Sequence, residues 1–293
     1  MNPTLLLVAA VVAMGTVSAC DASESSPMSS SAPASPTSSK GAPGVQAKLP
    51  FNGLSRPDGV AVDGAGAIYV NDAGNGRILK LAANSTTQEE LPFDGLFYAG
   101  GVAVDNTRTV YVADGNDRVV RLAAGASSQE VLPFNGLDGS GGVAVDPDGT
   151  VYVADVGNDR VLKLVPGAST QEMLPFEGLN HPGAVTVDDG GNLYVTDNGN
   201  DRVVKLAAGA TSQEVLAFKG LDVPNGIAVD ERGTVYLADA GNDRVVKLEA
   251  DSSTQEVLPL TGLDGGGGLA VDSKGTVYVT NSNTDLALRF PTQ

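Results

Sequence analysis

The sequence has few of the residues from which metal and disulfide sites are built: among 293 residues there are one Cys, one His and no Trp. A single Cys excludes an intrachain disulfide and a zinc site made of several cysteines, and a single His excludes a multi-histidine metal centre. A protein kinase is excluded as well, because its catalytic loop needs a His-Arg-Asp run and the one His lies in Asn180-His181-Pro182. We therefore expect no metal, no cofactor and no kinase activity.

Positive charge and aromatic side chains are also scarce. Lys and Arg number 18 against 35 Asp and Glu, which gives a net charge of −17 and an isoelectric point near 4.2. A protein that binds a phosphate backbone needs a basic face, so this balance excludes nucleic acid as a partner. The chain is nevertheless 42% hydrophobic, which is enough for a core, and its 37 glycines with few helix formers indicate a turn-rich β protein.

An apolar run covers residues 5–14 and reads LLLVAAVVAM. It is too short to span about 30 Å of hydrocarbon as a helix and is typical of the apolar region of a signal peptide. The residues that follow, Val17-Ser18-Ala19-Cys20, resemble the bacterial lipobox, in which the Cys thiol is acylated before cleavage. Residues 1–4 contain no Lys or Arg, which departs from the signal-peptide pattern. An ordinary secretory signal with an incidental Cys is the alternative.

This resemblance implies a signal peptide over residues 1–19 and lipidation of Cys20. One acyl chain anchors a protein weakly, so we expect more than one chain, palmitate among them. The stretch from 21 to 45 contains nine Ser, four Pro and no aromatic residue, and such a composition cannot bury enough apolar surface to fold. We interpret residues 20–45 as a lipidated Cys and a tether, either glycosylated or bare, that holds an exported domain at the outer face of the cell membrane.

The rest of the chain, residues 46–293, repeats one unit six times. The run Gly-x-Ala-Val-Asp, or a variant of it, recurs at intervals of 42, 41, 42, 42 and 42 residues and ends at Asp63, Asp105, Asp146, Asp188, Asp230 and Asp272. Each unit contains four short apolar runs separated by turn residues, which predicts four strands. Units of about 40 residues with four strands are propeller blades. The sequence therefore predicts an all-β fold, a six-bladed β-propeller.

The order of the strands predicts how the ring closes. The domain opens with residues 46–51, a copy of the outer strand, before any inner strand appears, and the last unit ends at Phe290 after its third strand. We expect the N-terminal copy to pair with the last strand and complete the sixth blade, which would remove an open sheet edge. The Pro within most copies of the outer strand fits an edge strand, which can lack one donor.

Asn180-His181-Pro182 is followed by GAVTVD and then by YVTDNGNDRVVKL. These runs resemble the NHL repeat, which is named for such a tripeptide. The repeated runs of residues 46–293 are also similar to the extracellular NHL-propeller sensor domain of mycobacterial receptor serine/threonine kinase D. The resemblance implies a six-bladed propeller in the cell envelope with a sensor-like domain. It implies no particular ligand, because propellers serve enzymes, receptors and scaffolds alike.

Residues present in nearly every unit are expected to have structural roles. Five units carry an Asp after the second predicted strand and an Arg shortly after it, so we expect bidentate ion pairs within or between the blades. The sixth unit changes both residues together, to Asn281 and Leu286, as a structural pair predicts. The two columns are Asp72, Asp114, Asp155, Asp197 and Asp239, and Arg77, Arg118, Arg160, Arg202 and Arg244.

Function is expected where the units differ, in the turns that lead into each inner strand. Phe97 and Tyr98 form an aromatic pair outside the repeat pattern, and they either bind a partner or cover the mouth of the channel. His181 makes a structural hydrogen bond or acts as a general base. These turns and the next ones are rich in Asp, which favours cationic ligands. The predicted ligand-binding residues are Phe97, Tyr98, Arg56, Asp138, His181 and Asn225.

Three functions remain open at this stage. The favoured one is a monomeric binding module that contacts the membrane only through its lipid anchor and recognises a protein, a peptide or a cell-wall component. The second is a metal-assisted enzyme of the streptogramin-lyase or gluconolactonase type, whose propellers this chain resembles. Such lactonases hold their metal with Glu, Asn and Asp facing the channel, and Asn180, Asn225, Asp138 and Glu177 lie near the expected mouth. The third is a structural scaffold.

Overall fold

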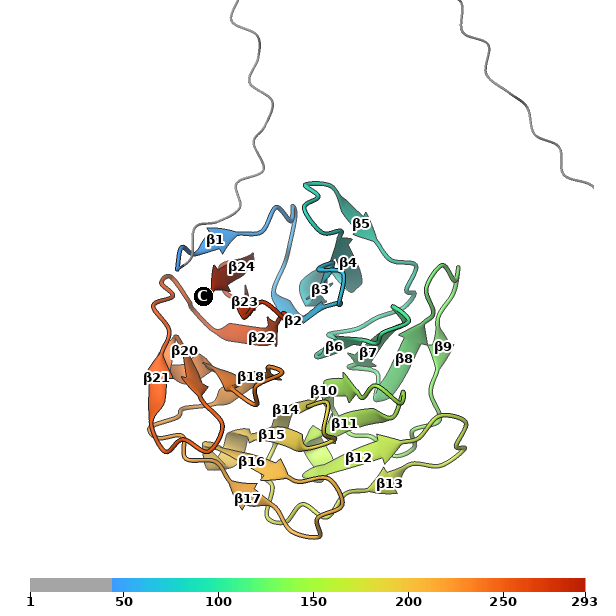
Figure 1. The fold of residues 1–293 in the computed structure, drawn as a ribbon. Coiled ribbons are helices and arrows are strands. Elements are labelled where there is room, and N and C mark those ends of the chain that lie inside the picture. Colours follow the sequence, from blue (N-terminus) through green and yellow to red (C-terminus); the bar gives the residue numbers. More distant parts are fainter. Residues whose placement is uncertain (1–43, 293) are drawn as a thin grey trace, which may run out of the picture. The chain divides into compact units, whose positions relative to one another are not determined.

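The computed structural model describes residues 44–292, which form six four-stranded antiparallel sheets arranged around a central channel (Figure 1). The predicted six-bladed β-propeller is therefore confirmed. The predicted signal peptide, Cys20 and nearly all of the tether lie outside the described residues. Among the residues described, no helix has the length and hydropathy needed to cross a membrane.

The inner strand of each blade comes from the Gly-x-Ala-Val run. Its side chains alternate between the two neighbouring blades: Val60 packs into the core cluster shared with the sixth blade, and Ala61 into the cluster shared with the second. Small residues suit this crowded position because six inner strands meet around one axis. The inner strands are β2 (Pro57–Val62), β6 (Val102–Val104), β10 (Ser140–Val145), β14 (Pro182–Val187), β18 (Pro224–Val229) and β22 (Gly266–Val271).

The second strand of each blade is buried between the two neighbouring blades, because apolar side chains on both of its faces pack against them. All five residues of β3 and of β7 are buried, including the Asp at each strand's end. These strands are β3 (Ile68–Asp72), β7 (Val110–Asp114), β11 (Val151–Asp155), β15 (Leu193–Asp197), β19 (Val235–Asp239) and β23 (Thr276–Asn281). The third strands are β4 (Arg77–Leu81), β8 (Arg118–Leu122), β12 (Arg160–Leu164), β16 (Arg202–Leu206), β20 (Arg244–Leu248) and β24 (Leu286–Pro291).

The outer strands are shorter than predicted. They end before the Leu-Pro-Phe run, so the Pro residues do not lie within the edge strand as expected. The Leu and Phe of that run turn inward instead, and Leu132 and Phe134 are buried against the core of the third blade. The outer strands are β1 (Ala47–Lys48), β5 (Gln88–Glu90), β9 (Glu130–Val131), β13 (Glu172–Met173), β17 (Glu214–Val215) and β21 (Gln255–Val257).

The ring closes as the sequence predicts. Strand β1 pairs with β24, so that Ala47 faces Arg289 and Lys48 faces Leu288, and Figure 1 shows the blue N-terminal strand beside the red C-terminal one. Gln46 completes the seam: its side chain accepts a hydrogen bond from the Thr261 N–H at 2.9 Å and donates to the Thr261 carbonyl at 3.0 Å. The same two-bond contact of a Gln side chain with a backbone N–H and carbonyl, which we call the glutamine clamp, occurs between all the remaining pairs of neighbouring blades. It is made by Gln88, Gln129, Gln171, Gln213 and Gln255.

The repeated Asp and Arg residues pair within each blade. Arg77 Nε lies 2.7 Å from Asp72 Oδ2, while its Nη2 donates to the Gly53 carbonyl, so the contact is not the expected bidentate one. In the sixth blade, Asn281 donates to the Gly262 carbonyl itself at 2.7 Å and needs no Arg. Four of the turns after the second strand are single-turn 3-10 helices: η1 (Ala73–Asn75), η2 (Val156–Asn158), η3 (Asn198–Asn200) and η4 (Ala240–Asn242).

Candidate functional site

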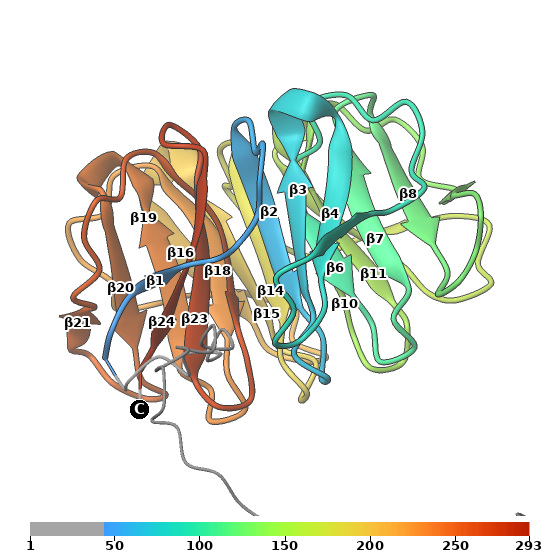
Figure 2. The same ribbon diagram turned by 90° about the horizontal axis from the view of Figure 1, so that it is seen from above.

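One face of the propeller carries the variable turns. The loop before each inner strand and the turn between the second and third strands meet there, as when Gly74 N–H donates to the Ser55 carbonyl at 2.8 Å. We call this side the mouth face; it is uppermost in Figure 2, where the turn between β3 and β4 is seen. A buried Asp fixes this loop in five blades, as when Asp114 accepts a hydrogen bond from the Phe97 N–H at 2.8 Å and Asp72 one from the Ser55 N–H at 2.6 Å. In the sixth blade Asn281 accepts the corresponding bond from the Asp264 N–H at 3.3 Å.

A ring of six residues with left-handed backbone surrounds the mouth. All six stand at the same position of the repeat; five of them directly precede an inner strand, and Tyr98 lies four residues before the start of β6. Two of them are glycines, which adopt positive φ without strain, whereas the other four carry side chains in a conformation that costs about 1–2 kcal/mol per residue. We call this set the mouth ring: Arg56 (φ 44°), Tyr98 (φ 39°), Gly139 (φ 67°), His181 (φ 50°), Val223 (φ 46°) and Gly265 (φ 64°).

Carboxylates of the preceding blades hold this ring in place. Asp285 accepts a hydrogen bond from the Arg56 N–H at 2.7 Å, and Asp159 accepts one from the His181 N–H at 2.7 Å. The same bond recurs at three further blades, through Asp117, Asp201 and Asp243. At Tyr98 the corresponding residue of the preceding blade is Gly76, which has no side chain to accept the bond. Side-chain contacts hold Tyr98 instead.

Arg56, Phe97 and Tyr98 form one cluster on this face. The rings of Phe97 and Tyr98 meet edge to face with centroids 4.7 Å apart, and the Arg56 guanidinium lies 4.9 Å above the Tyr98 ring centre. Arg56 Nη2 also donates a hydrogen bond to the Tyr98 hydroxyl at 3.0 Å. Phe97 is nevertheless 55% exposed and Tyr98 54% exposed, and neither lines the channel. The aromatic pair therefore lies exposed on the surface of the mouth face.

The other predicted residues lie on the same face but apart from this cluster. Asp138 stands in the loop of the third blade and packs against Gly157, and His181 Nδ1 lies 2.8 Å from Asn180 Oδ1. Asn225 is not in a loop as expected, because it is the second residue of β18 and so belongs to an inner strand. Val223, which is 50% exposed in the mouth ring, was not predicted from the sequence. It could have been identified because it occupies the same repeat position as the other ring residues.

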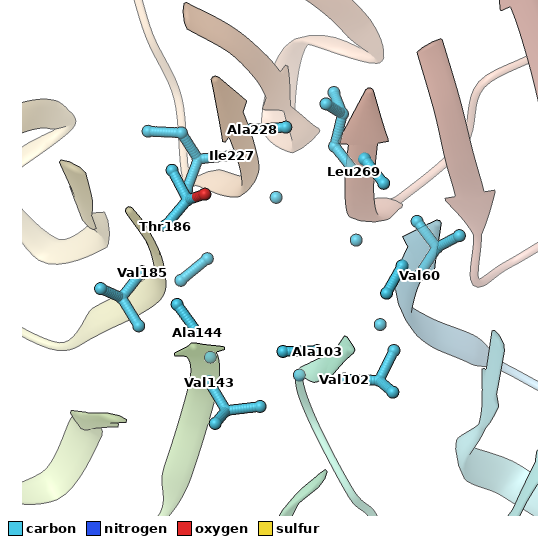
Figure 3. A pocket seen from close by; sticks show the side chains of 18 of the residues that line it. Val60, Val102, Ala103, Val143, Ala144, Val185, Thr186, Ile227, Ala228 and Leu269 are labelled. Carbon is cyan, nitrogen blue, oxygen red and sulfur yellow. The ribbon is translucent and has the colours of Figure 1, made fainter. Parts of the chain in front are cut away.

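The channel below the mouth has a volume of about 360 Å³. It is lined by the inner strands, mostly by Gly, Ala and Val, and Figure 3 shows the Thr186 hydroxyl as the one polar group among the labelled side chains. Each inner strand pairs on one side only, so its other backbone edge faces the channel. This interior offers small apolar groups and backbone, and Asp189, two residues beyond the end of β14, lines it as well.

At the upper end of the inner strands, the ligand set of Glu, Asn and Asp that the lactonase resemblance implies is incomplete. At the upper end of the inner strands, one repeat position carries Asp58, Gly100, Gly141, Gly183, Asn225 and Gly267. Asp58 and Asn225 are thus the two oxygen ligands at that level, and the blade between them contributes Gly267. Within residues 44–292 no group of three His, Cys, Asp or Glu side chains is placed to hold a metal ion. Glu177 lies near the rim, where its backbone binds Gln213.

Comparison with known proteins places the chain among propellers. The family model described as the SMP-30/Gluconolactonase/LRE-like region matches residues 116–293. No curated protein sequence gives a significant match.

Several solved structures share the fold. A gluconolactonase from Xanthomonas campestris is 18% identical with a TM-score of 0.69, covering 84% of this chain and 89% of that one. A streptogramin B lyase is 13% identical with a TM-score of 0.65, covering 84% and 96%. A chain of the nidogen/laminin complex is 22% identical with a TM-score of 0.65, covering 74% and 86%. At these identities the likeness concerns the fold alone.

Proposed function

The chain belongs to the SMP-30/gluconolactonase/LRE-like family, and we propose that it uses the propeller as a binding module whose recognition surface is the mouth face. The exposed cluster of Phe97, Tyr98 and Arg56 carries this proposal. Large aromatic and Arg side chains are the residues that most often dominate binding energy at interfaces. Here they stand together on loops that the buried Asp residues hold rigidly.

The strain in the mouth ring supports the same conclusion. Four side chains occupy left-handed backbone at a position where glycine would be free of strain, and two blades do carry glycine there. Strained backbone that persists in a stable fold concentrates at ligand-binding and catalytic positions. Val223 is the clearest case, because a β-branched residue is disfavoured in this region and its side chain is half exposed.

The charge of the mouth face favours a cationic ligand. The five repeated Arg residues are already paired, since each guanidinium contacts a buried Asp. Arg56 is a further cation on this face. The carboxylates of its loops and turns are Asp117, Asp138, Asp159, Asp201, Asp222, Asp243, Asp264 and Asp285, and Asp58 lies at the start of β2 rather than in a turn as expected. Such a field raises the association rate of cations and is screened by salt. A protein, or a wall peptide with free amines, fits better than an anionic lipid.

The proposal includes the place where the module works. The lipobox-like run that ends at Cys20 supports export and a lipid anchor at the outer face of the cell membrane, with the tether as a spacer. The similarity to the sensor domain of mycobacterial receptor kinase D supports a sensor-like role in the cell envelope. Lipidation is read out by membrane fractionation and by the mass of the mature protein.

The experiment that tests the recognition surface compares partner affinity between two surfaces of the same protein. A partner captured from envelope extract is titrated against wild type and against the double variant Phe97→Ala, Tyr98→Ala. Loss of two anchors should weaken binding by about 2 kcal/mol or more, which is roughly thirtyfold. The matched control is Met173→Ala, which removes an apolar side chain that is 69% exposed on the rim. If Met173→Ala weakens partner binding and the double variant does not, the recognition surface lies elsewhere.

The second candidate is a metal-assisted enzyme, which the family match and the likeness to a lactonase and a lyase favour. Its weakness is the mouth of the channel, where Asp58 and Asn225 are the two oxygen ligands and a third is missing. Metal content after gentle purification discriminates the two functions. Stoichiometric metal that is lost in the variant Asp58→Asn would favour the enzyme, whereas metal-free protein that still binds its partner would favour the binding module.

A further inference from the structure

The outer edge of the fourth blade has free backbone groups for a further strand. In every blade a Leu directly follows the outer strand and donates its N–H to the third strand, as Leu216 does to the Val203 carbonyl at 2.9 Å. Backbone hydrogen bonds of an antiparallel pair alternate along each strand. The residues on either side of this Leu, Val215 and Ala217, therefore point their N–H and C=O groups away from the sheet.

The second of these outward positions is a Pro in the other five blades. Pro has no N–H, and a Pro at a sheet edge keeps another strand from pairing there. In the fourth blade Ala217 restores the donor, and no group within residues 44–292 accepts a hydrogen bond from its N–H. Strand β17 is the last strand of its sheet and lies at the outside of the ring (Figure 1). The five prolines are Pro50, Pro92, Pro133, Pro175 and Pro259.

A groove of about 410 Å³ lies beside this edge, between the fourth and fifth blades. One wall is formed by Val215, Leu216 and Ala217, and the other by residues 249–252, in the turn between β20 and β21. Val215 is 56% exposed at the edge of the groove. Side chains of a strand that is added beside β17 would alternate between the two faces of the enlarged sheet, so every second one would point into this groove.

The wall that the fifth blade contributes is acidic, and this is a departure from the repeat. Glu249 stands where the first four blades carry Ala or Val, and Asp251 stands where they carry Gly or Asn. Lys205 is the one cation among the lining residues that the structure describes, and its Nζ is already paired with Glu214 at 3.2 Å. The missing Pro of the fourth blade and the added carboxylates of the fifth thus meet in one groove.

We propose that the outer edge of the fourth blade binds an extended basic segment of a partner protein, which adds to the sheet as a further strand beside β17. Main-chain hydrogen bonds to Val215 and Ala217 supply affinity, and the side chains supply specificity. A residue opposite Glu214 points into the groove, where a Lys or Arg meets the carboxylates, and a residue opposite Val215 lies on the other face, where an apolar side chain covers it. The segment therefore alternates basic and apolar residues.

Charge favours such a segment over a second copy of this chain. In a symmetric dimer the same edge of both copies would pair, which would bring the two acidic grooves together and oppose association. The edge of the fourth blade is separate from the mouth face, so this inference goes beyond the proposed function and does not rest on it.

The test uses a capped, fluorescently labelled peptide of sequence Thr-Lys-Val-Lys-Thr, titrated with the full chain at low salt and followed by fluorescence anisotropy. Wild type should bind it saturably. The same peptide with an N-methyl group on its central Val cannot donate that hydrogen bond to the edge and should not bind. The peptide Thr-Glu-Val-Glu-Thr keeps the backbone and reverses the charge, and it should not bind either.

The variants use residues that other blades carry at the same positions, which keeps them compatible with the fold. Ala217→Pro removes the donor and should weaken peptide binding about tenfold or more, while its melting temperature stays within a few degrees of wild type. The double variant Glu249→Ala, Asp251→Gly should weaken binding of the Lys peptide and reduce its dependence on salt.

Four outcomes would overturn the inference. No saturable binding by wild type, or equal binding by Ala217→Pro, would mean that no strand adds at this edge. Equal binding of the N-methyl peptide would exclude main-chain pairing. A dimer in sedimentation that Ala217→Pro dissociates would assign the edge to a second copy. Loss of peptide binding in Phe97→Ala, Tyr98→Ala would place the peptide on the mouth face, whereas unchanged binding by that variant supports the separate site, whatever its affinity for a partner of the mouth face.

Discussion

Replacing Asp58 by asparagine should stabilise the folded propeller at neutral pH, because the substitution removes a charge that burial disfavours. The amide has nearly the same shape as the protonated carboxyl and carries no charge. In the wild type the ionised carboxylate lies beside Gly267 without a hydrogen-bond donor within the described residues. Its charge is therefore poorly solvated in the folded state and fully solvated in the unfolded chain, which penalises folding.

The magnitude follows from the pKa. Burial raises the pKa of Asp58 from 3.8 to about 6, and each pH unit corresponds to about 1.36 kcal/mol. The ionised carboxylate then lowers the free energy of unfolding by at most about 3 kcal/mol, and partial access to solvent reduces this to about 1–3 kcal/mol. Since the folded state holds the proton more tightly than the unfolded state, this destabilisation is absent below about pH 4, grows as the pH rises, and is complete above about pH 6.

Chemical denaturation at a series of pH values measures this effect as a difference between two proteins. The other carboxylates titrate in both proteins, so their contributions cancel when Asp58→Asn is compared with wild type. The two should be nearly equal in stability at pH 4, and the variant should be more stable by about 1–3 kcal/mol at pH 7. The variant Asp222→Asn should show no such divergence. A constant difference between pH 4 and pH 7, or a less stable Asp58→Asn at pH 7, would refute the reasoning.

Three further predictions concern the ring, the seam and the anchor. Val223→Gly should raise the free energy of unfolding by about 0.5–1 kcal/mol, because relief of left-handed strain exceeds the added chain entropy; a loss of stability measured by denaturation would contradict this. Deletion of residues 1–51 removes the buried side chains Leu49 and Phe51 and should cost more than about 4 kcal/mol, whereas deletion of 1–45 should cost little; equal melting temperatures would refute the seam. Cys20→Ala should release the protein from membranes, and unchanged fractionation and mass would refute the anchor.

Most of the fold could be predicted because the chain repeats one set of local signals six times. The Gly-x-Ala-Val-Asp run, the strand that follows and the position of Gln46 before any inner strand determine the number of blades and the closure of the ring. The outer strand was predicted too long because its apolar residues continue past its end. Leu132 and Phe134 are apolar for another reason, since they turn inward and cover the blade, and an apolar pattern does not distinguish a strand from a buried loop.

The candidate site could be predicted in part. Departures from the repeat identified Phe97 and Tyr98, and their exposure on the mouth face follows from the turn in which they lie. The contact of Arg56 with Tyr98 could not be foreseen, because it joins two blades through side-chain geometry. The sequence shows Asp58 only as one of several acidic residues near the mouth face. What sets it apart is the lack of a donor, and this depends on Thr280 and Ser282, which are far away in the sequence.

The same interactions explain how the propeller tolerates an unfavourable binding face. The glutamine clamps, the buried Asp residues and the paired strands recur around the ring and do not depend on the mouth. Four strained ring residues and one unpaired carboxylate are then supported by a framework that is stable without them.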